Sequence, residues 1–153
     1  EGRRDPIEGA NVQFSRGFDY AVRSLVFLAG RPDGKSSDLD SIARTQKLPR
    51  SYLAKVMRSL VRGGIVTSNY GRGGGYILRR PPQEINLLDI YEVMEGKMFF
   101  VECMKDKKGC DLYGGCVQFR ELDKVRKKVE DAFRETTLAS LTKSNNSIEG
   151  NPA

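Results

Sequence analysis

The alternation of apolar and polar positions predicts a mainly helical chain interrupted by one pair of short strands. Apolar residues recur every three or four positions in several stretches, which is typical of helices with one buried face. These predicted helices cover residues 18–29, 38–47, 49–62, 86–95 and 119–141, and the predicted strands cover residues 65–70 and 76–79. The last helix carries an apolar stripe of Leu122, Val125, Val129 and Phe133.

Turn and cap residues set the limits of these elements. Asp38 and Asn86 precede apolar segments and are good helix N-caps, because their side-chain oxygens accept hydrogen bonds from free backbone amides. Another helix starts at Pro49, where a missing N–H is harmless, and ends at Gly63–Gly64. A glycine-rich tip joins the two strands, which are therefore predicted to form a β-hairpin.

The order of the elements predicts a winged helix-turn-helix domain. A short helix, a tight break at Leu48–Pro49, a second helix and a hairpin follow one another, as in proteins that place the second helix in the major groove of DNA. The predicted fold class is therefore mainly α with a small β-hairpin, followed by a long C-terminal dimerisation helix. The predicted divisions are residues 1–11 and 144–153 as vector-derived or disordered ends, 12–96 as the winged domain, 97–118 as a cysteine loop and 119–143 as the dimerisation helix.

Positive charge is concentrated between the two ends of the chain. The sequence has 26 Lys and Arg residues against 20 Asp and Glu, a net charge of +6 and a pI near 9.3. Both ends are net negative, so the basic surface belongs to residues 12–143. Such a surface predicts a polyanionic partner, and double-stranded DNA is the one that a winged domain accommodates.

Candidate DNA contacts lie on the second helix of the motif and on the hairpin. Short polar and cationic side chains on one helix face suit the major groove, and an Arg between glycines suits a narrow minor groove. The predicted contacts are Arg50, Ser51, Tyr52, Lys55 and Arg58 on the helix, with Tyr70 and Arg72 on the hairpin. An ordinary solvated face is the competing interpretation of each cation taken singly. No Gly-Lys-Ser/Thr follows the glycines, so the tip is not a nucleotide phosphate loop.

Histidine is absent from the sequence, which limits its chemistry. The usual general base, the serine and cysteine triads and His-containing zinc sites are excluded, so neither an enzyme nor a small-molecule substrate is predicted. No apolar run approaches the roughly 18 residues of a membrane span, and no apolar leader precedes the first helix. A cytoplasmic protein without a membrane partner is expected.

Three cysteines lie close together before the last helix. Cys103, Cys110 and Cys116 are spaced C-x6-C-x5-C with glycines between them, and soft thiolates on a flexible loop suit iron–sulfur ligation. The spacing matches neither the paired C-x2-C of zinc ribbons nor the bacterial ferredoxin run. Redox-active or incidental thiols, a zinc site and a small iron–sulfur electron-transfer protein are the alternatives.

Two long segments and the cysteine loop carry a resemblance to a known family. QFSRGFDYAVRSLVFLA and LDSIARTQKLPRSYLAKVMRSLVRGGIVTSNYGRGGGYILRRPP, followed by INLLDIYEVMEG, closely resemble the bacterial winged-helix regulators typified by IscR and NsrR. This resemblance covers residues 12 to 143 and implies a homodimeric transcriptional repressor that binds a DNA operator. Family members often carry an Arg where this chain has Tyr70, while Arg72 occupies the hairpin tip.

The resemblance also implies a cofactor and its ligands. Iron–sulfur members carry three cysteines at this place, so the three thiols would bind a cluster, 4Fe–4S in preference to 2Fe–2S, that senses nitric oxide, redox state or iron–sulfur supply. IscR-like members add a His where this chain has Phe119, whereas NsrR-like members take an Asp from the partner subunit, at the position of Asp19. Asp19 has a second interpretation as a first-turn carboxylate paired with Arg23. A cluster-free thiol-redox regulator is the alternative for the whole chain.

Overall fold

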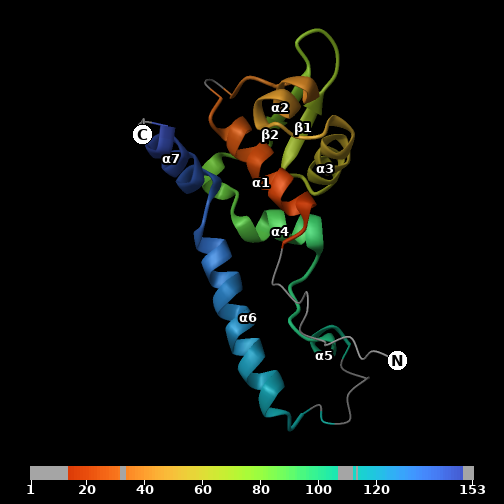
Figure 1. Ribbon diagram of the computed structural model, residues 1–153, viewed down its shortest axis with the longest axis vertical. Coiled ribbons are helices and arrows are strands. Elements are labelled where there is room, and N and C mark those ends of the chain that lie inside the picture. The colour runs from red at the N-terminus through yellow and green to blue at the C-terminus, as the bar shows by residue number, and fades with distance from the viewer. Residues whose placement is uncertain (1–13, 32–33, 107–111, 113, 150–153) are drawn as a thin grey trace, which may run out of the picture.

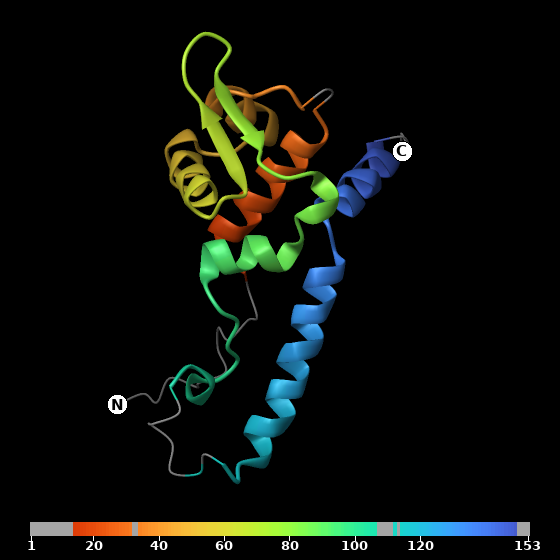
Figure 2. The ribbon, with the colours of Figure 1, turned by 180° about the vertical axis from the view of Figure 1, so that it is seen from behind.

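The computed structural model of the chain describes residues 14–31, 34–106, 112 and 114–149. Its elements in chain order are α1 (Arg16–Ala29), α2 (Leu39–Gln46), α3 (Arg50–Arg62), β1 (Val66–Asn69), β2 (Gly75–Leu78), the 3-10 helix η2 (Pro82–Glu84), α4 (Leu87–Glu95), α5 (Glu102–Lys105), α6 (Val117–Glu135) and α7 (Leu138–Glu149). Figures 1 and 2 show two regions: a winged body built from α1 to α4, the β-hairpin and α7, and an arm whose described residues are 99–106, 112 and 114–135, with α5 and α6. The predicted segment 1–11 lies outside the described residues.

One hydrophobic core holds the winged body together. Leu25 of α1, Ile42 of α2, Leu53 and Met57 of α3 and Ile90 of α4 are all fully buried. Each such side chain contributes about 1.5–3 kcal/mol to folding by leaving water. The helix faces that the sequence predicted to point inward are therefore the faces that build this core.

Side-chain caps open α2 and α4, as predicted. Asp38 accepts hydrogen bonds from the backbone N–H and the hydroxyl of Ser41, both at 2.8 Å, and these bonds lower the pKa of the Asp38 carboxyl. Asn86 accepts from the N–H of Asp89 at 3.0 Å, and the Asp89 carboxylate accepts from the N–H of Asn86 at 3.4 Å. This reciprocal pair is a capping box, and it fixes where α4 begins.

The β-hairpin is antiparallel and is attached to the segment before α2. Val66 lies opposite Leu78, and Asn69 lies opposite Gly75. Tyr76 of β2 also exchanges two backbone hydrogen bonds with Ser37, at 2.8 and 3.0 Å. Gly75 has a φ of 146°, and a Cβ there would lie 2.5 Å from the backbone of Ser37, so only glycine allows this close approach.

The long C-terminal helix predicted from the sequence is broken. Thr136 adopts an extended conformation, and its carbonyl accepts a hydrogen bond from the N–H of Leu87 at 2.9 Å. Thr137 and Ser140 then cap a new helix reciprocally, each side-chain oxygen accepting from the other's N–H. Two helices, α6 and α7, therefore replace the single predicted one, and α7 continues to Glu149 where a tail was predicted from residue 144.

An aromatic cluster joins the end of α6 to the winged body. The Phe133 ring stacks on Phe18 with centroids 6.2 Å apart, and it meets Tyr91 edge-on at 6.0 Å. Burial in this cluster raises the pKa of the Tyr91 hydroxyl. Phe133 thus packs within its own chain, which corrects its prediction as a member of the dimer stripe.

Candidate functional site

α3 separates an apolar face from a polar, cationic one. Leu53, Val56, Met57 and Leu60 are buried in the core. The predicted contacts on the opposite face are all exposed: Arg50, Ser51, Tyr52, Lys55 and Arg58. The ring of Tyr52 also meets Tyr20 of α1, with centroids 5.4 Å apart and planes at 84°, so its orientation is fixed by packing.

A groove runs between α3 and the hairpin. Its cavity of about 410 Å³ is lined by Arg58 and Arg62 from α3 and by Tyr70 from the hairpin, among other residues. A second hollow beside it is lined by Lys55, Arg58, Ser59 and Arg62. Tyr70 is 96% exposed. The structure therefore brings three of the predicted contacts, Lys55, Arg58 and Tyr70, to one surface.

Arg72 occupies the tip of the hairpin. The loop that joins β1 and β2 protrudes from the winged body in both ribbon views (Figures 1 and 2). A hydrogen bond from the N–H of Gly74 to the carbonyl of Gly71, at 3.0 Å, closes the tip. Gly71 and Gly73, on either side of Arg72, have positive φ values of 100° and 78°. Arg72 is therefore flanked by two residues that have no side chain. Arg72 itself is exposed.

Arg50 forms an ion pair that sequence reasoning did not foresee. Its guanidinium donates to the Asp40 carboxylate of α2, and this bond raises the pKa of Arg50. The two side chains remain 64% and 59% exposed, so water screens the pair. Arg50 is the first residue of α3.

The two described cysteines lie in the arm and outside the core. Cys103 belongs to α5, and both it and Cys116 are partly exposed. Cys116 is the N-cap of α6, where its sulfur accepts a hydrogen bond from the N–H of Phe119 at 3.4 Å. Cys110 lies outside the described residues, and the described ones contain no group of three or more His, Cys, Asp or Glu that could hold a metal ion.

Asp19 lies in the first turn of α1, within the winged body. Its carboxylate is 57% exposed and lies 3.7 Å from the guanidinium of Arg23, which also donates to the carbonyl of Gln46. Figures 1 and 2 show α4 between α1 and the arm. The structure therefore does not bring Asp19 to Cys103 or Cys116, the two described cysteines of its own chain.

An ion-pair network on α6 was not predicted from the sequence. Arg126 of α6 bonds to Asp123 at 2.7 Å and to Glu130 at 2.5 Å, which raises the pKa of Arg126 and lowers that of Asp123. These groups help to line a cavity of about 530 Å³. Met104, which follows Cys103 in the sequence, and Phe119, three residues after Cys116, also line it. The i,i+3 and i,i+4 spacing of the three charges is the signal that would have revealed the network.

Comparison with known proteins agrees with this geometry. CymR, the global cysteine regulator of B. subtilis, shares 30% identity, with 88% of this chain and 98% of that one covered and a TM-score of 0.73. IscR of T. potens shares 29% identity over 94% and 95% of the two chains, with a TM-score of 0.75. A protein of Aquifex aeolicus provisionally assigned as an HTH-type transcriptional regulator is 30% identical over 130 residues, which are 84% of this chain and 90% of that protein.

These similarities confirm the predicted winged-helix fold class, and they class the chain as a regulator and not as an enzyme. Within the described residues, no helix combines the length and apolar character needed to cross a membrane. The profile of the Rrf2 family, described as iron-dependent transcriptional regulators, matches residues 14–144, and the chain therefore belongs to the Rrf2 family.

Proposed function

We propose that this regulator is a homodimeric repressor that binds a double-stranded DNA operator through α3 and the hairpin. The observation that carries the proposal is the exposed cationic side of α3, where Lys55, Arg58 and Arg62 share one surface with the hairpin. A B-DNA major groove about 12 Å wide admits a single helix. The protruding hairpin tip is then available to the adjacent minor groove.

Each predicted contact takes a role that its exposure and charge permit. Ser51, Tyr52, Lys55 and Arg58 face the major groove, where Lys and Arg bond to guanine O6 and N7. Arg72 enters the minor groove, whose negative potential is strongest where it is narrow, and Tyr70 lies beside the sugar–phosphate backbone. Arg50 binds a phosphate after leaving Asp40, and phosphate contacts of this kind orient the protein on the duplex.

A second copy of the chain is proposed to cover α6. None of the residues of α6 is buried in the single chain, and Val117 and Val125 are 60% and 48% exposed. Together with Leu122 and Val129, Val125 forms the remaining apolar stripe of the helix. Packing two such stripes about a two-fold axis would present two α3 helices to two half-sites of one operator.

The arm is proposed to bind an iron–sulfur cluster, 4Fe–4S in preference to 2Fe–2S. Cys103, Cys110 and Cys116 would be its thiolate ligands, and Asp19 of the partner subunit would be the fourth. The two described thiols fit this role, since both are partly exposed outside the core and sulfur is a ligand that iron–sulfur clusters prefer. A bound cluster supplies reactivity toward nitric oxide, oxidants or iron limitation, while these ligands would tie the arm of one chain to α1 of the other.

A cluster-free thiol switch is the second candidate function. Its support is the similarity to CymR, a cysteine regulator, together with the accessible sulfur of Cys116. The two candidates share the DNA interface and differ in what the arm holds. An absorption spectrum of protein purified without oxygen separates them, because only an iron–sulfur cluster absorbs in the visible range.

The DNA interface is tested with an operator selected from random duplexes and gel-shift titrations at fixed salt. Lys55→Ala and Arg58→Ala should each weaken binding by about 1–3 kcal/mol if the side chain bonds to a base edge. Arg72→Ala should weaken binding chiefly at operators with a narrow A·T-rich minor groove. Lys128→Ala, which removes an exposed cation from α6, is the matched control and should leave affinity unchanged. Unchanged affinity in all three interface variants would refute this assignment of the interface.

A further inference from the structure

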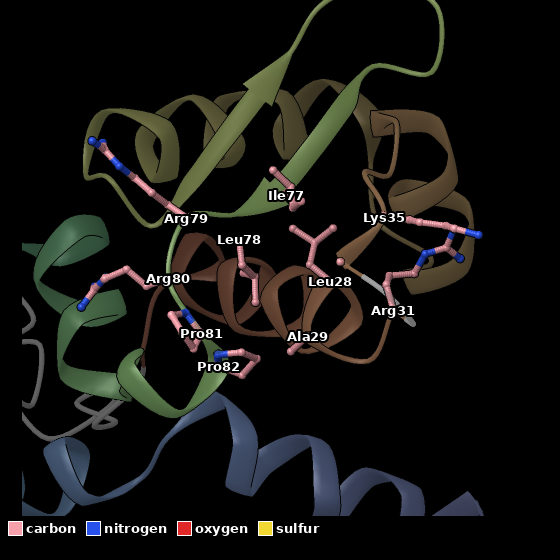
Figure 3. Close-up of a pocket in the computed structure, with 11 residues that line it drawn as sticks. Leu28, Ala29, Arg31, Lys35, Ile77, Leu78, Arg79, Arg80, Pro81 and Pro82 are labelled. Atoms are coloured by element: carbon pink, nitrogen blue, oxygen red, sulfur yellow. The ribbon is translucent and has the colours of Figure 1, made fainter.

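A separate cavity of about 380 Å³ lies against the root of the hairpin (Figure 3). It is lined by the end of α1, by Arg31, Gly34 and Lys35, by β2 and by the segment that follows β2. Its described lining shares no residue with the groove between α3 and the hairpin. A volume of about 300–1,000 Å³ is the usual range for small-molecule sites.

The lining combines an apolar surface with positive charge. Leu28, Ile77, Leu78, Pro81 and Pro82 supply the apolar part. The charged members are all cations, namely Arg31, Lys35, Arg79 and Arg80, and no acidic residue is among the described lining residues. This composition matches a ligand that carries an anionic head on an apolar body.

The cations differ in whether their charge is already compensated. Arg80 donates to the Asp89 carboxylate at 3.2 Å and to the Glu84 carbonyl at 3.0 Å, so it is engaged within the protein. Arg31 lies over the ring of Phe27, 5.7 Å from its centroid, and such stacking leaves the edge of the guanidinium open to an anion. Figure 3 shows Arg31 and Lys35 extending to the same side of the cavity. These two side chains form the place for an anionic head.

The walls of the cavity are held in position without a ligand. The two hydrogen bonds between Ser37 and Tyr76 clamp the segment that carries Lys35 against β2. At the other end of β2, the N–H of Arg79 donates to the carbonyl of Ile65 at 3.0 Å. Leu28, on the α1 side, is only 4% exposed. A ligand would therefore enter a preformed site and would not have to order its walls.

We infer that this cavity binds a small organic anion, with a carboxylate or phosphate head at Arg31 and Lys35 and an apolar body against Leu28, Ile77 and Pro82. β2 forms a wall of the cavity and is also one strand of the hairpin, so a bound anion would change the position of the hairpin tip. Binding itself is independent of the proposed DNA function. Only its effect on operator affinity rests on that proposal.

The inference is tested by titrating the ¹⁵N-labelled full chain with octanoate, octyl phosphate and octan-1-ol, followed by NMR. Amide shifts should concentrate at residues 28–31, 34–37 and 76–80 for the two anions and be weak for the alcohol, and the tighter anion identifies the head group. An Arg31→Gln, Lys35→Gln double variant should bind that anion at least about tenfold more weakly, because it loses charged hydrogen-bond partners. Lys128→Gln, which removes a cation far from the cavity, should bind it as the wild type does.

Three results would overturn the inference. Equal affinity in the double variant would mean that the two cations do not bind the head. Shifts concentrated on the exposed apolar residues of α6 would mean that the probe acts as a surfactant. Reduced operator affinity of the ligand-free double variant, with anion binding unchanged, would assign Arg31 and Lys35 to DNA phosphates. If binding is seen, saturation with the anion should also change operator affinity in the wild type and not in the double variant, and no change would overturn the link to the hairpin.

Discussion

The winged body and the arm bury their apolar residues in different ways. Every helix from α1 to α4 contributes buried side chains to one core, whereas no described residue between 99 and 135 is buried. Large apolar side chains in the arm, including Phe99, Phe100 and Val125, are more than 40% exposed. The body thus buries its apolar core within one chain, whereas the described residues of the arm leave large apolar side chains exposed, which is why we propose that a second chain covers them.

The junction of the two regions shows how they are coupled. Phe133 stacks into the aromatic cluster of the body, and the carbonyl of Thr136 is bonded to the start of α4. The beginning of α6, at Cys116, lies in the arm, where no described residue is buried.

Val125→Asp, in the arm, should have the largest effect of the variants considered, and that effect should be on dimerisation. It places a carboxylate in the apolar stripe that a second chain would cover, and it should weaken dimerisation by at least about 100-fold, because an unpaired charge is costly to bury. Val125 is half exposed in the single chain, so circular dichroism should show an intact fold. Sedimentation velocity measures the association.

Arg120→Asp is the control for that variant, since it introduces the same carboxylate at an exposed position on the opposite side of α6. It should remain as dimeric as the wild type. A Val125→Asp variant that stays dimeric at low micromolar concentration would place the dimer contact elsewhere.

Phe133→Ala should have the next largest effect, which should be a loss of stability of the winged body. Removing the ring leaves a gap beside Phe18 and Tyr91 and should lower the free energy of unfolding by about 2–3 kcal/mol. Val117→Ala, at the start of the same helix, should change the free energy of unfolding by less than about 1 kcal/mol. Urea unfolding measures both values, and equal losses would mean that the two ends of α6 are anchored alike.

Asp38→Asn should have the smallest effect and should appear only in acid. The pKa of Asp38 is lowered in the folded state by its bonds from Ser41, so its stabilisation is present above its ordinary pKa of about 3.9 and is lost as pH falls through the lower folded value. Asn caps the helix equally well and does not titrate. Thermal unfolding between pH 5 and pH 2 should therefore show a smaller decline for the variant, and parallel declines would remove the cap from the pH response.

The winged body could be predicted from the sequence because its signals are local. The spacing of Leu53, Val56, Met57 and Leu60 marks a helix face, and Asp38 and Asn86 mark helix starts. The break at Thr136 has one local signal, the cap formed by Thr137 and Ser140, which the predicted single helix overlooked. Its other support could not be predicted from local sequence, since it consists of backbone bonds to residues 85–87, some 50 positions earlier in the chain. For the same reason the stripe of α6 assigned Phe133 to a second chain, although it packs on Phe18 of its own.

The candidate site divides along the same line. Exposure of Lys55, Arg58 and Arg72 follows from their place on a helix face and a turn, so the sequence could predict it. The Asp40–Arg50 pair and the cavity at the hairpin root depend on contacts between elements distant in sequence, and neither was predicted.

The most direct test asks whether the cysteine arm controls DNA binding. It measures operator affinity while nitric oxide removes the visible absorbance of the protein. Wild-type protein purified without oxygen should absorb in the visible range, and its operator affinity should change by at least about tenfold, which corresponds to about 1.4 kcal/mol, as that absorbance is lost. Cys103→Ser should lack the chromophore, and its affinity should not respond to nitric oxide. A wild-type protein that takes up no iron, or one whose affinity stays constant while the absorbance disappears, would contradict the account.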